Sequence, residues 1–274
     1  MTSPEIFDRR LIRANLECAA PAAHEVDFLV RYAAEELVDR LGAFKRNFGL
    51  AADTGAYHGV TARLLKERFG EMRVVSLSGA ASLAGACPAP SAAASEEALP
   101  LRESTFDLIV SALSLHLVND LPGALIQIRR ALRPDGVFLG ALLGGETLIE
   151  LRHAFAMAEN ETAGGISPRV FPTADVREMG ALLQRAGFAM PVADTERLTV
   201  TYADPLALMR ELKAMGAANP LAARSRKPLR RDTLARAAAT YSEHFGEPDG
   251  RVRATFEILY LCGWAPAGAQ KASG

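Results

Sequence analysis

Leu50-Ala-Ala-Asp-Thr-Gly-Ala-Tyr-His-Gly59 is the stretch that decides the fold, because it combines a strand, a tight turn and the start of a helix. The apolar run ends in Asp53, a glycine turn follows at Gly55, and Gly59 opens a helical pattern. This order lets backbone N–H groups and a helix N-terminus approach a cofactor closely. The residues before the second glycine are Ala-Tyr-His, where such a loop usually holds another glycine. The stretch therefore predicts a diverged cofactor-binding loop.

Length and composition indicate a globular α/β protein. The chain has 274 residues, 49% of them apolar and 23% charged, which suits one large domain or one domain with an insertion. A net charge of −1 argues against a nucleic-acid partner, and the basic clusters at 129–133 and 224–231 are expected to be solvated surface. The three cysteines form no CxxC pair, which argues against a disulfide framework and a structural zinc site.

No targeting or membrane-spanning segment is expected from the sequence. The longest apolar stretch, 136–145, is about half as long as a membrane span requires and is rich in glycine. Residues 1–10 contain acidic and basic side chains without an apolar centre, unlike a signal peptide. The sequence therefore predicts a cytoplasmic protein without a transmembrane segment.

Hydrophobic periodicity predicts strands that alternate with helices in the first half of the chain. Strands are expected at 46–53, 72–77, 106–113 and 137–143, and helices at 25–41, 61–69 and 121–132. The segment 78–98 is expected to hold a short helix and a short strand, and Arg-Pro-Asp-Gly at 133–136 is expected to stop a helix and turn. Such alternation implies βαβ units, and hence a parallel sheet with right-handed crossovers.

The pattern changes after residue 147, where helices become more frequent. Helices are expected at 147–161, 175–186, 205–215 and 231–245, and strands at 198–202 and 252–264. Residues 164–168, which include two glycines and a proline, are expected to separate the helix at 147–161 from the helix at 175–186.

Seven motifs within these elements carry a resemblance to a family; those at 99–107 and 132–136 are general, and those at 114–121 and 144–148 are much narrower. The seven motifs are Leu99-Pro-Leu-Arg-Glu-Ser-Thr-Phe-Asp107, Ser114-Leu-His-Leu-Val-Asn-Asp-Leu121, Leu132-Arg-Pro-Asp-Gly136, Gly144-Gly-Glu-Thr-Leu148, Gly164-Gly-Ile-Ser-Pro168, Leu182-Leu-Gln-Arg-Ala-Gly-Phe188 and Asp249-Gly-Arg-Val-Arg-Ala-Thr-Phe256. With them the chain resembles class I S-adenosylmethionine-dependent methyltransferases. More narrowly, it resembles the bacterial relatives of a methyltransferase-like assembly factor of respiratory complex I, from Phe7 to Trp264.

The resemblance implies a Rossmann-like α/β fold with a seven-stranded, mostly parallel sheet whose last strand is antiparallel. It places S-adenosylmethionine over the carboxyl ends of the first strands and a helical lid over the substrate. The division expected is a helical segment at 1–43, a methyltransferase-like core at 44–203, the lid at 204–248, the last core strand at 249–266 and a flexible tail at 267–274.

The resemblance also implies three acidic positions for the cofactor. Asp53 matches the first, whereas the ribose position falls near Leu77, where no carboxylate exists, and the adenine position falls at Ser95, just before Glu96. Loss of the ribose carboxylate is expected to weaken binding by roughly 10- to 100-fold. The expected cofactor-binding residues are Asp53, Gly55, Ala56, Tyr57, Gly59, Leu77, Ser95, Glu96 and Ser111.

The roles of His116, His58 and Tyr57 each have more than one interpretation. His116 follows a strand end and is the catalytic candidate, as a base or a substrate-positioning group, the alternative being a packed histidine. Asn119 and Asp120 are expected to cap the next helix. His58 could contact cofactor or solvent, with solvent favoured. Tyr57 is expected either to occupy a strained backbone region or to fill the methionine pocket.

Three hypotheses about function follow. The chain could be an S-adenosylmethionine-dependent transferase acting on a protein substrate in complex I assembly. By resemblance it could instead hydroxylate an arginine of a complex I subunit, although no metal-binding signature is present in the sequence. The third hypothesis is a non-catalytic assembly protein that uses the fold to bind a protein partner, such as a complex I subunit.

Overall fold

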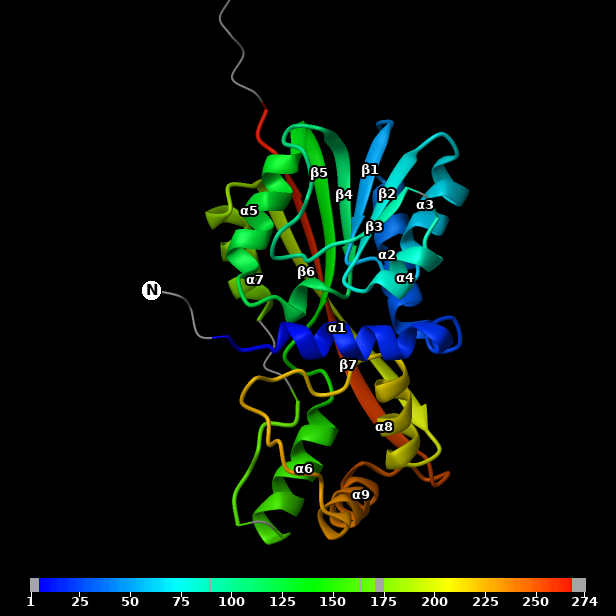
Figure 1. The fold of residues 1–274 in the computed structure, drawn as a ribbon, viewed down its shortest axis with the longest axis vertical. Helices are drawn as coiled ribbons and strands as arrows, with labels where there is room; N and C mark the ends of the chain where they lie inside the picture. Colours follow the sequence, from blue (N-terminus) through cyan, green and yellow to red (C-terminus); the bar gives the residue numbers. More distant parts are fainter. Residues whose placement is uncertain (1–4, 89, 163, 171–174, 268–274) are drawn as a thin grey trace, which may run out of the picture. The chain divides into compact units, whose positions relative to one another are not determined.

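The computed structural model of the protein describes residues 5–88, 90–162, 164–170 and 175–267. Their strands form a seven-stranded sheet in the order β3-β2-β1-β4-β5-β7-β6. The strands are β1 (Leu50–Thr54), β2 (Arg73–Ser78), β3 (Ser91–Ala93), β4 (Phe106–Ala112), β5 (Leu132–Leu143), β6 (Ala189–Tyr202) and β7 (Val252–Trp264). The sheet confirms the expected fold class (Figure 1).

The described residues contain the helices that the periodicity predicts and one more, at residues 9–19. They are α1 (Arg9–Ala19), α2 (Phe28–Gly42), α3 (Val60–Phe69), α4 (Ala81–Ala86), α5 (Leu121–Ala131), α6 (Ile149–Thr162), α7 (Val176–Arg185), α8 (Pro205–Ala214) and α9 (Arg231–Phe245). Two short 3₁₀ turns, η1 (Ala20–Ala22) and η2 (Leu115–Leu117), complete the set. The expected tail at 267–274 lies, from residue 268 on, outside the described residues.

The described residues form two compact units. The core unit comprises Asp27–Leu142, Ala174–Thr195 and Leu259–Gly274, and the second unit comprises Met1–Val26, Leu143–Thr173 and Glu196–Ile258. Within the core unit, α5 and α7 lie on one side of the strands and α2, α3 and α4 on the other (Figure 1). The second unit contains α1, α6, α8 and α9, and its helices α6 and α9 pack against each other.

Strand directions follow the expected pattern. β1 pairs in parallel with β2 and β4, β2 with β3, and β4 with β5. Near the start of β5, the Gly136 carbonyl accepts the Ala265 N–H, and just after its end the Gly144 N–H donates to the Glu257 carbonyl. The partner residue number falls as the β5 residue number rises, so β7 runs antiparallel to β5. The carboxyl ends of β1, β2 and β4 therefore meet at one edge, which is where a parallel α/β sheet places a ligand.

Three boundaries differ from the sequence prediction. β1 begins at Leu50 rather than at residue 46, because the backbone N–H groups of Gly49 and Leu50 donate to the Asp107 carboxylate instead of to a strand. Residues 133–136 lie within β5, where Asp135 adopts a left-handed conformation next to a register shift, rather than outside it. β6 spans 14 residues instead of the expected five.

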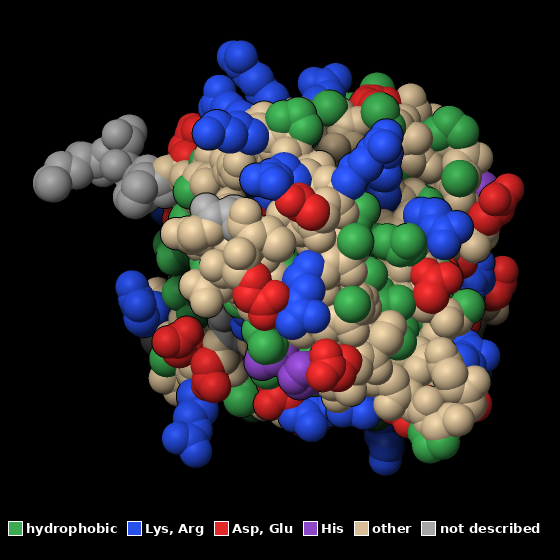
Figure 2. Space-filling view, turned by 90° about the horizontal axis from the view of Figure 1, so that it is seen from below, with side chains coloured by type: hydrophobic (Ala, Val, Ile, Leu, Met, Phe, Trp, Pro, Cys, Tyr) green, Lys and Arg blue, Asp and Glu red, His purple; other side chains and the backbone are tan. Residues whose placement is uncertain are grey.

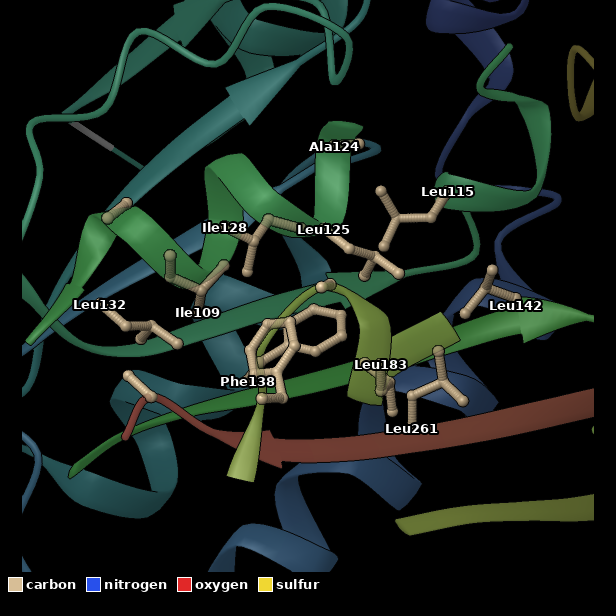
Figure 3. Close-up of a cluster of buried hydrophobic side chains, with 14 of the residues drawn as sticks. Ile109, Leu115, Ala124, Leu125, Ile128, Leu132, Phe138, Leu142, Leu183 and Leu261 are labelled. Carbon is tan, nitrogen blue, oxygen red and sulfur yellow. The ribbon is translucent and has the colours of Figure 1, made fainter. Parts of the chain in front are cut away.

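One hydrophobic cluster of the core unit lies between the sheet and the α5–α7 layer. Leu125 and Ile128 of α5 and Leu183 of α7 pack over Ile109 and Phe138 of the sheet (Figure 3). Each of these side chains is at most 1% exposed, and full burial of such a side chain contributes about 1.5–3 kcal/mol. This layer fixes β4 and β5, and so fixes the loops that leave their carboxyl ends.

Figure 2 shows acidic and basic side chains interspersed over one face of the molecule. Within the basic clusters, Arg133 pairs with Asp107 and Arg224 pairs with Asp8, at 2.9 and 3.1 Å. Arg133 is half exposed, as expected for a solvated surface, whereas the Arg224 side chain is only 21% exposed and links two distant segments.

Candidate functional site

The loop between β1 and α3 depends on both of its glycines. Gly55 and Gly59 have φ angles of +72° and +81°, a backbone region that favours glycine. A Cβ on Gly55 would lie 1.8 Å from the Ser114 Oγ, and one on Gly59 would lie 2.9 Å from the Cys87 Cα. The Ala56 N–H donates to the Leu77 carbonyl at 2.8 Å, which fixes the turn over the end of β2.

Asp53 is the buried acid of this loop. Its side chain is fully buried, and among the described residues neither carboxylate oxygen has a hydrogen-bond partner of acceptable geometry. Burial raises the pKa of Asp53 from its usual 3.8 to about 7, and the nearby backbone N–H of Ala62 in the first turn of α3 offsets only part of this rise. Within the described part of the chain, both oxygens are thus held at the carboxyl end of β1 without a well-aligned protein donor.

His58 is buried, so the expectation that it faces solvent was wrong. Its Nε2 lies 2.9 Å from the Asp27 Oδ2, and its Nδ1 lies 2.5 Å from the Arg63 Nη2. An arginine can only donate, and the carboxylate of Asp27 accepts, so these partners fix the neutral tautomer with its proton on Nε2. Asp27 also pairs with Arg31 at 2.7 Å. The network ties the loop to the start of α2.

Tyr57 does not have the expected backbone strain. Among the described residues it is not one of those with a positive φ, so no glycine is needed at this position. Its ring centroid lies 5.4 Å from that of His58. Burial, and secondarily the charge of Asp27, raise the pKa of Tyr57 to about 12. The phenol therefore stays neutral and lies beside the network that anchors the loop.

The expected ribose position lacks a carboxylate in the structure, whereas the expected adenine position has one beside it. Leu77 is buried at the end of β2 and supplies only its carbonyl, which Ala56 already occupies. Ser95 accepts the Glu97 N–H through its Oγ at 3.2 Å. Glu96, by contrast, is 6% exposed, and its Oε1 lies 3.3 Å from where a Cβ on Gly55 would be. The structure thus brings Glu96, rather than Ser95, to the glycine loop.

Ser111 and His116 lie at and beyond the end of β4. The Oγ of the buried Ser111 is 3.0 Å from the Ser114 Oγ, which in turn contacts Gly55. His116 is partly buried in η2, and burial lowers its pKa to about 3. The imidazole is therefore neutral at pH 7 and weakly basic. Of the two expected helix caps, Asp120 caps α5 through the Gly123 N–H, and the Asn119 N–H donates to Glu97.

The structure therefore brings most of the expected residues to one edge of the core unit's strands. Asp27, Arg63 and Ser114 also support this edge, and sequence reasoning missed them. Asp27 lies 31 residues before its partner His58, and no local spacing could have linked the two.

The Gly144-Gly-Glu-Thr motif belongs to the second unit and has a structural role there. A Cβ on Gly144 would lie 2.5 Å from the Glu257 Oε2, which accepts the Glu146 N–H at 2.9 Å. The Thr147 hydroxyl donates to the Glu257 carbonyl and accepts from the Glu257 N–H, each at 3.1 Å. The motif therefore fastens this segment to β7.

The described residues contain neither a metal-binding cluster nor a membrane-spanning helix. No group of three or more His, Cys, Asp and Glu side chains in the described ranges is arranged to hold a metal ion. None of the helices in these ranges is both long enough and apolar enough to cross a membrane.

Comparisons with known proteins agree with the fold and with the loop. Residues 52–140 match a family described as "Methyltransferase domain". The human protein named "Arginine-hydroxylase NDUFAF5, mitochondrial" is 44% identical over 273 residues, which covers 96% of this chain and 79% of that protein. The "Malonyl-[acyl-carrier protein] O-methyltransferase" of Halorhodospira halophila is 36% identical over 270 residues, covering 96% of this chain and 90% of that protein.

A solved structure shows the same fold at low sequence identity. The crystal structure of the YcgJ protein from Bacillus subtilis has a TM-score of 0.58 and 14% identity, and the match covers 86% of this chain and 99% of that one. Family and fold are those of S-adenosylmethionine-dependent methyltransferases, and they support the cofactor that the sequence predicts.

Proposed function

Because the chain belongs to the methyltransferase-domain family that includes arginine-hydroxylase NDUFAF5 and the malonyl-[acyl-carrier protein] O-methyltransferases, we propose that it binds S-adenosylmethionine and modifies a protein substrate during assembly of respiratory complex I. Family membership supports the cofactor. The name of the human relative supports the arginine substrate and, through the resemblance, the assembly role.

The observation that carries the cofactor proposal is the Asp53 carboxylate. A buried carboxyl group with two unpartnered oxygens makes the free energy of folding less favourable, because the group loses its hydrogen bonds to water and gains none in the protein. A ligand that brings N–H or O–H donors to this edge removes that cost. S-adenosylmethionine carries an ammonium group and ribose hydroxyls, and both are donors of this kind.

The residues present fit this cofactor in part. The left-handed conformations of Gly55 and Gly59 let the backbone approach a ligand closely, and α3 begins directly after Gly59. Glu96 supplies a second carboxylate beside the loop. Leu77 offers no acceptor to the ribose hydroxyls, so binding is expected to be roughly 10- to 100-fold weaker than with a carboxylate there.

Bound S-adenosylmethionine supplies an electrophilic methyl group on a sulfonium. Ser111 and Ser114 are placed at the end of β4 to donate or accept hydrogen bonds at the same edge. His116 follows them, but a base whose pKa is about 3 gains little from taking up a proton at pH 7. We therefore assign His116 a substrate-positioning role through hydrogen bonding rather than a role as general base.

A second candidate substrate is a malonyl group on an acyl carrier protein. The observation that favours it is the extent of the match, since the alignment spans 90% of the Halorhodospira protein and 79% of the human one. The substrate of the human relative is favoured by the higher identity. A lid role for α8 and α9, and a cytoplasmic location, stay predictions from the sequence.

Calorimetric titration of the full chain with S-adenosylmethionine and S-adenosylhomocysteine tests the proposal, with Asp53→Ala as the control. Micromolar binding that the variant loses supports an enzyme. The next step is then mass spectrometry of complex I subunits and of malonyl-acyl carrier protein after incubation, because methylation and hydroxylation give different mass increments. No heat at near-millimolar ligand would refute cofactor binding and favour the non-catalytic assembly protein.

A further inference from the structure

Residues 95–99 form a tight turn beside the glycine loop. The Ala98 N–H donates to the Ser95 carbonyl at 3.1 Å, and the Glu97 N–H donates to the Ser95 hydroxyl at 3.2 Å. The second residue of the turn is Glu96, and this geometry directs its buried carboxylate toward Gly55. Whatever fixes the turn therefore also fixes the carboxylate.

Gln127 of α5 binds the turn from one side with both atoms of its amide. Its Oε1 accepts the Leu99 N–H at 3.0 Å, and its Nε2 donates to the Glu97 carbonyl at 3.0 Å. Both partners are backbone groups with fixed roles, so the orientation of the amide is unambiguous. A single side chain thus pairs with the turn as a neighbouring strand would.

The turn is held from a second point as well. The Glu97 Oε1 accepts the Asn119 N–H at 2.7 Å, at the start of the segment that leads into α5. Gln127 itself is only partly buried, whereas Ala124, Leu125 and Ile128 face the core from the same helix. Replacing the Gln127 amide therefore leaves the packing of α5 intact.

We propose that Gln127 is a positioning residue that holds Glu96 against the glycine loop, where the Glu96 carboxylate binds hydrogen-bond donors of the cofactor. This inference rests on the cofactor binding proposed above. The donors belong either to the nucleoside part, which carries the ribose hydroxyls and the adenine amine, or to the amino-acid part, which carries the ammonium group. Both sources present the same chemistry to a carboxylate, and the choice of ligand separates them.

The test compares Gln127→Met, Glu96→Gln and the double variant with the wild-type chain. Methionine keeps the length and helix propensity of glutamine but makes no comparable hydrogen bonds. Gln184→Met, at an exposed position of α7, is the matched control. Calorimetry with S-adenosylhomocysteine and with 5′-methylthioadenosine, which lacks the amino-acid part, gives the affinities. Hydrogen exchange of the unliganded proteins reports on residues 95–99.

We expect Gln127→Met to weaken S-adenosylhomocysteine binding about five- to tenfold and Glu96→Gln to weaken it about tenfold or more. The double variant should bind no more weakly than Glu96→Gln alone, because Gln127 acts through Glu96. Equal losses for 5′-methylthioadenosine identify a donor in the nucleoside part, and a loss for S-adenosylhomocysteine alone identifies the ammonium group. Gln184→Met should bind both ligands normally.

Hydrogen exchange separates this inference from the proposal on which it rests. Gln127→Met should speed exchange of residues 95–99 and leave β1 and α5 unchanged, with or without any cofactor affinity. Unchanged exchange in the turn, a general increase over the core unit, or additive effects in the double variant would each overturn the positioning role. Absence of binding by the wild-type chain would instead overturn the proposed function, while the exchange result still decides the role of Gln127.

Discussion

Replacing His58 with alanine should destabilise the core unit by about 3–5 kcal/mol. The substitution removes two hydrogen bonds with charged partners, Asp27 and Arg63, and each such bond contributes about 1.5–3 kcal/mol. Among the described residues, it also leaves Asp27, which is 7% exposed, with the half-exposed Arg31 as its ion-pair partner. Removing one member of a buried ionic network is costly because the remaining charge loses its compensation.

Urea denaturation followed by tryptophan fluorescence measures this effect. The chain has one tryptophan, Trp264, which packs against Phe44 in the core unit at a ring-centroid distance of 5.4 Å. The signal therefore reports on the unit that contains His58. Glutamine at position 58 can still donate to Asp27 and should be intermediate. Gln184→Ala, at an exposed position of the same unit, should change stability by less than about 0.5 kcal/mol. A loss below about 1 kcal/mol for His58→Ala would refute the reasoning.

Three further substitutions test the loop and the acids beside it. Asp53→Asn should stabilise the protein above pH 7 and change little near pH 4. The folded-state pKa of about 7 lies above the usual 3.8, so wild-type stability falls as pH rises between these values, by up to ~4 kcal/mol in urea titrations at each pH. Gly55→Ala should abolish S-adenosylhomocysteine binding and lower the free energy of unfolding by more than about 2 kcal/mol, because the new Cβ would clash with Ser114. Gly70 also has a positive φ, of +52°, but no atom of the described residues lies within 4 Å of where its Cβ would be, so Gly70→Ala should lower the free energy of unfolding by only about 1 kcal/mol. Leu77→Asp should tighten that binding about tenfold in calorimetry although it destabilises the fold, and unchanged affinity would contradict the assigned ribose position.

The order of elements could be predicted because each strand and helix has a periodic apolar pattern of its own. The helix expected at 231–245 and the strand expected at 252–264 have the same bounds in the structure. The start of β1 could not be predicted, because it depends on Asp107, which is distant in sequence and captures two backbone donors that a strand would have used. Local pattern contains no information about such a partner.

The site was predictable to a similar degree. Asp53 and the two glycines follow from strand, turn and helix signals that lie next to one another in the chain. The place of Glu96 depends on Gln127 and Asn119, which approach the turn from a different segment. The sequence offered a choice between Ser95 and its neighbours, and only these long-range bonds select Glu96. The roles of these residues toward a ligand stay predictions.

The middle of the glycine loop shows why divergence of a motif and loss of its geometry are separate questions. The absence of a third glycine suggested a damaged loop, but a glycine is required only where φ is positive or a Cβ would clash. Gly55 and Gly59 meet both conditions, whereas Tyr57 meets neither of the backbone conditions that would exclude a side chain. His58 then adds bonds to Asp27 and Arg63 that no glycine could make. The loop therefore keeps left-handed glycines at both of its ends and gains side-chain anchors. Its altered sequence is weak evidence against the proposed binding, and the missing carboxylate at Leu77 is the stronger evidence.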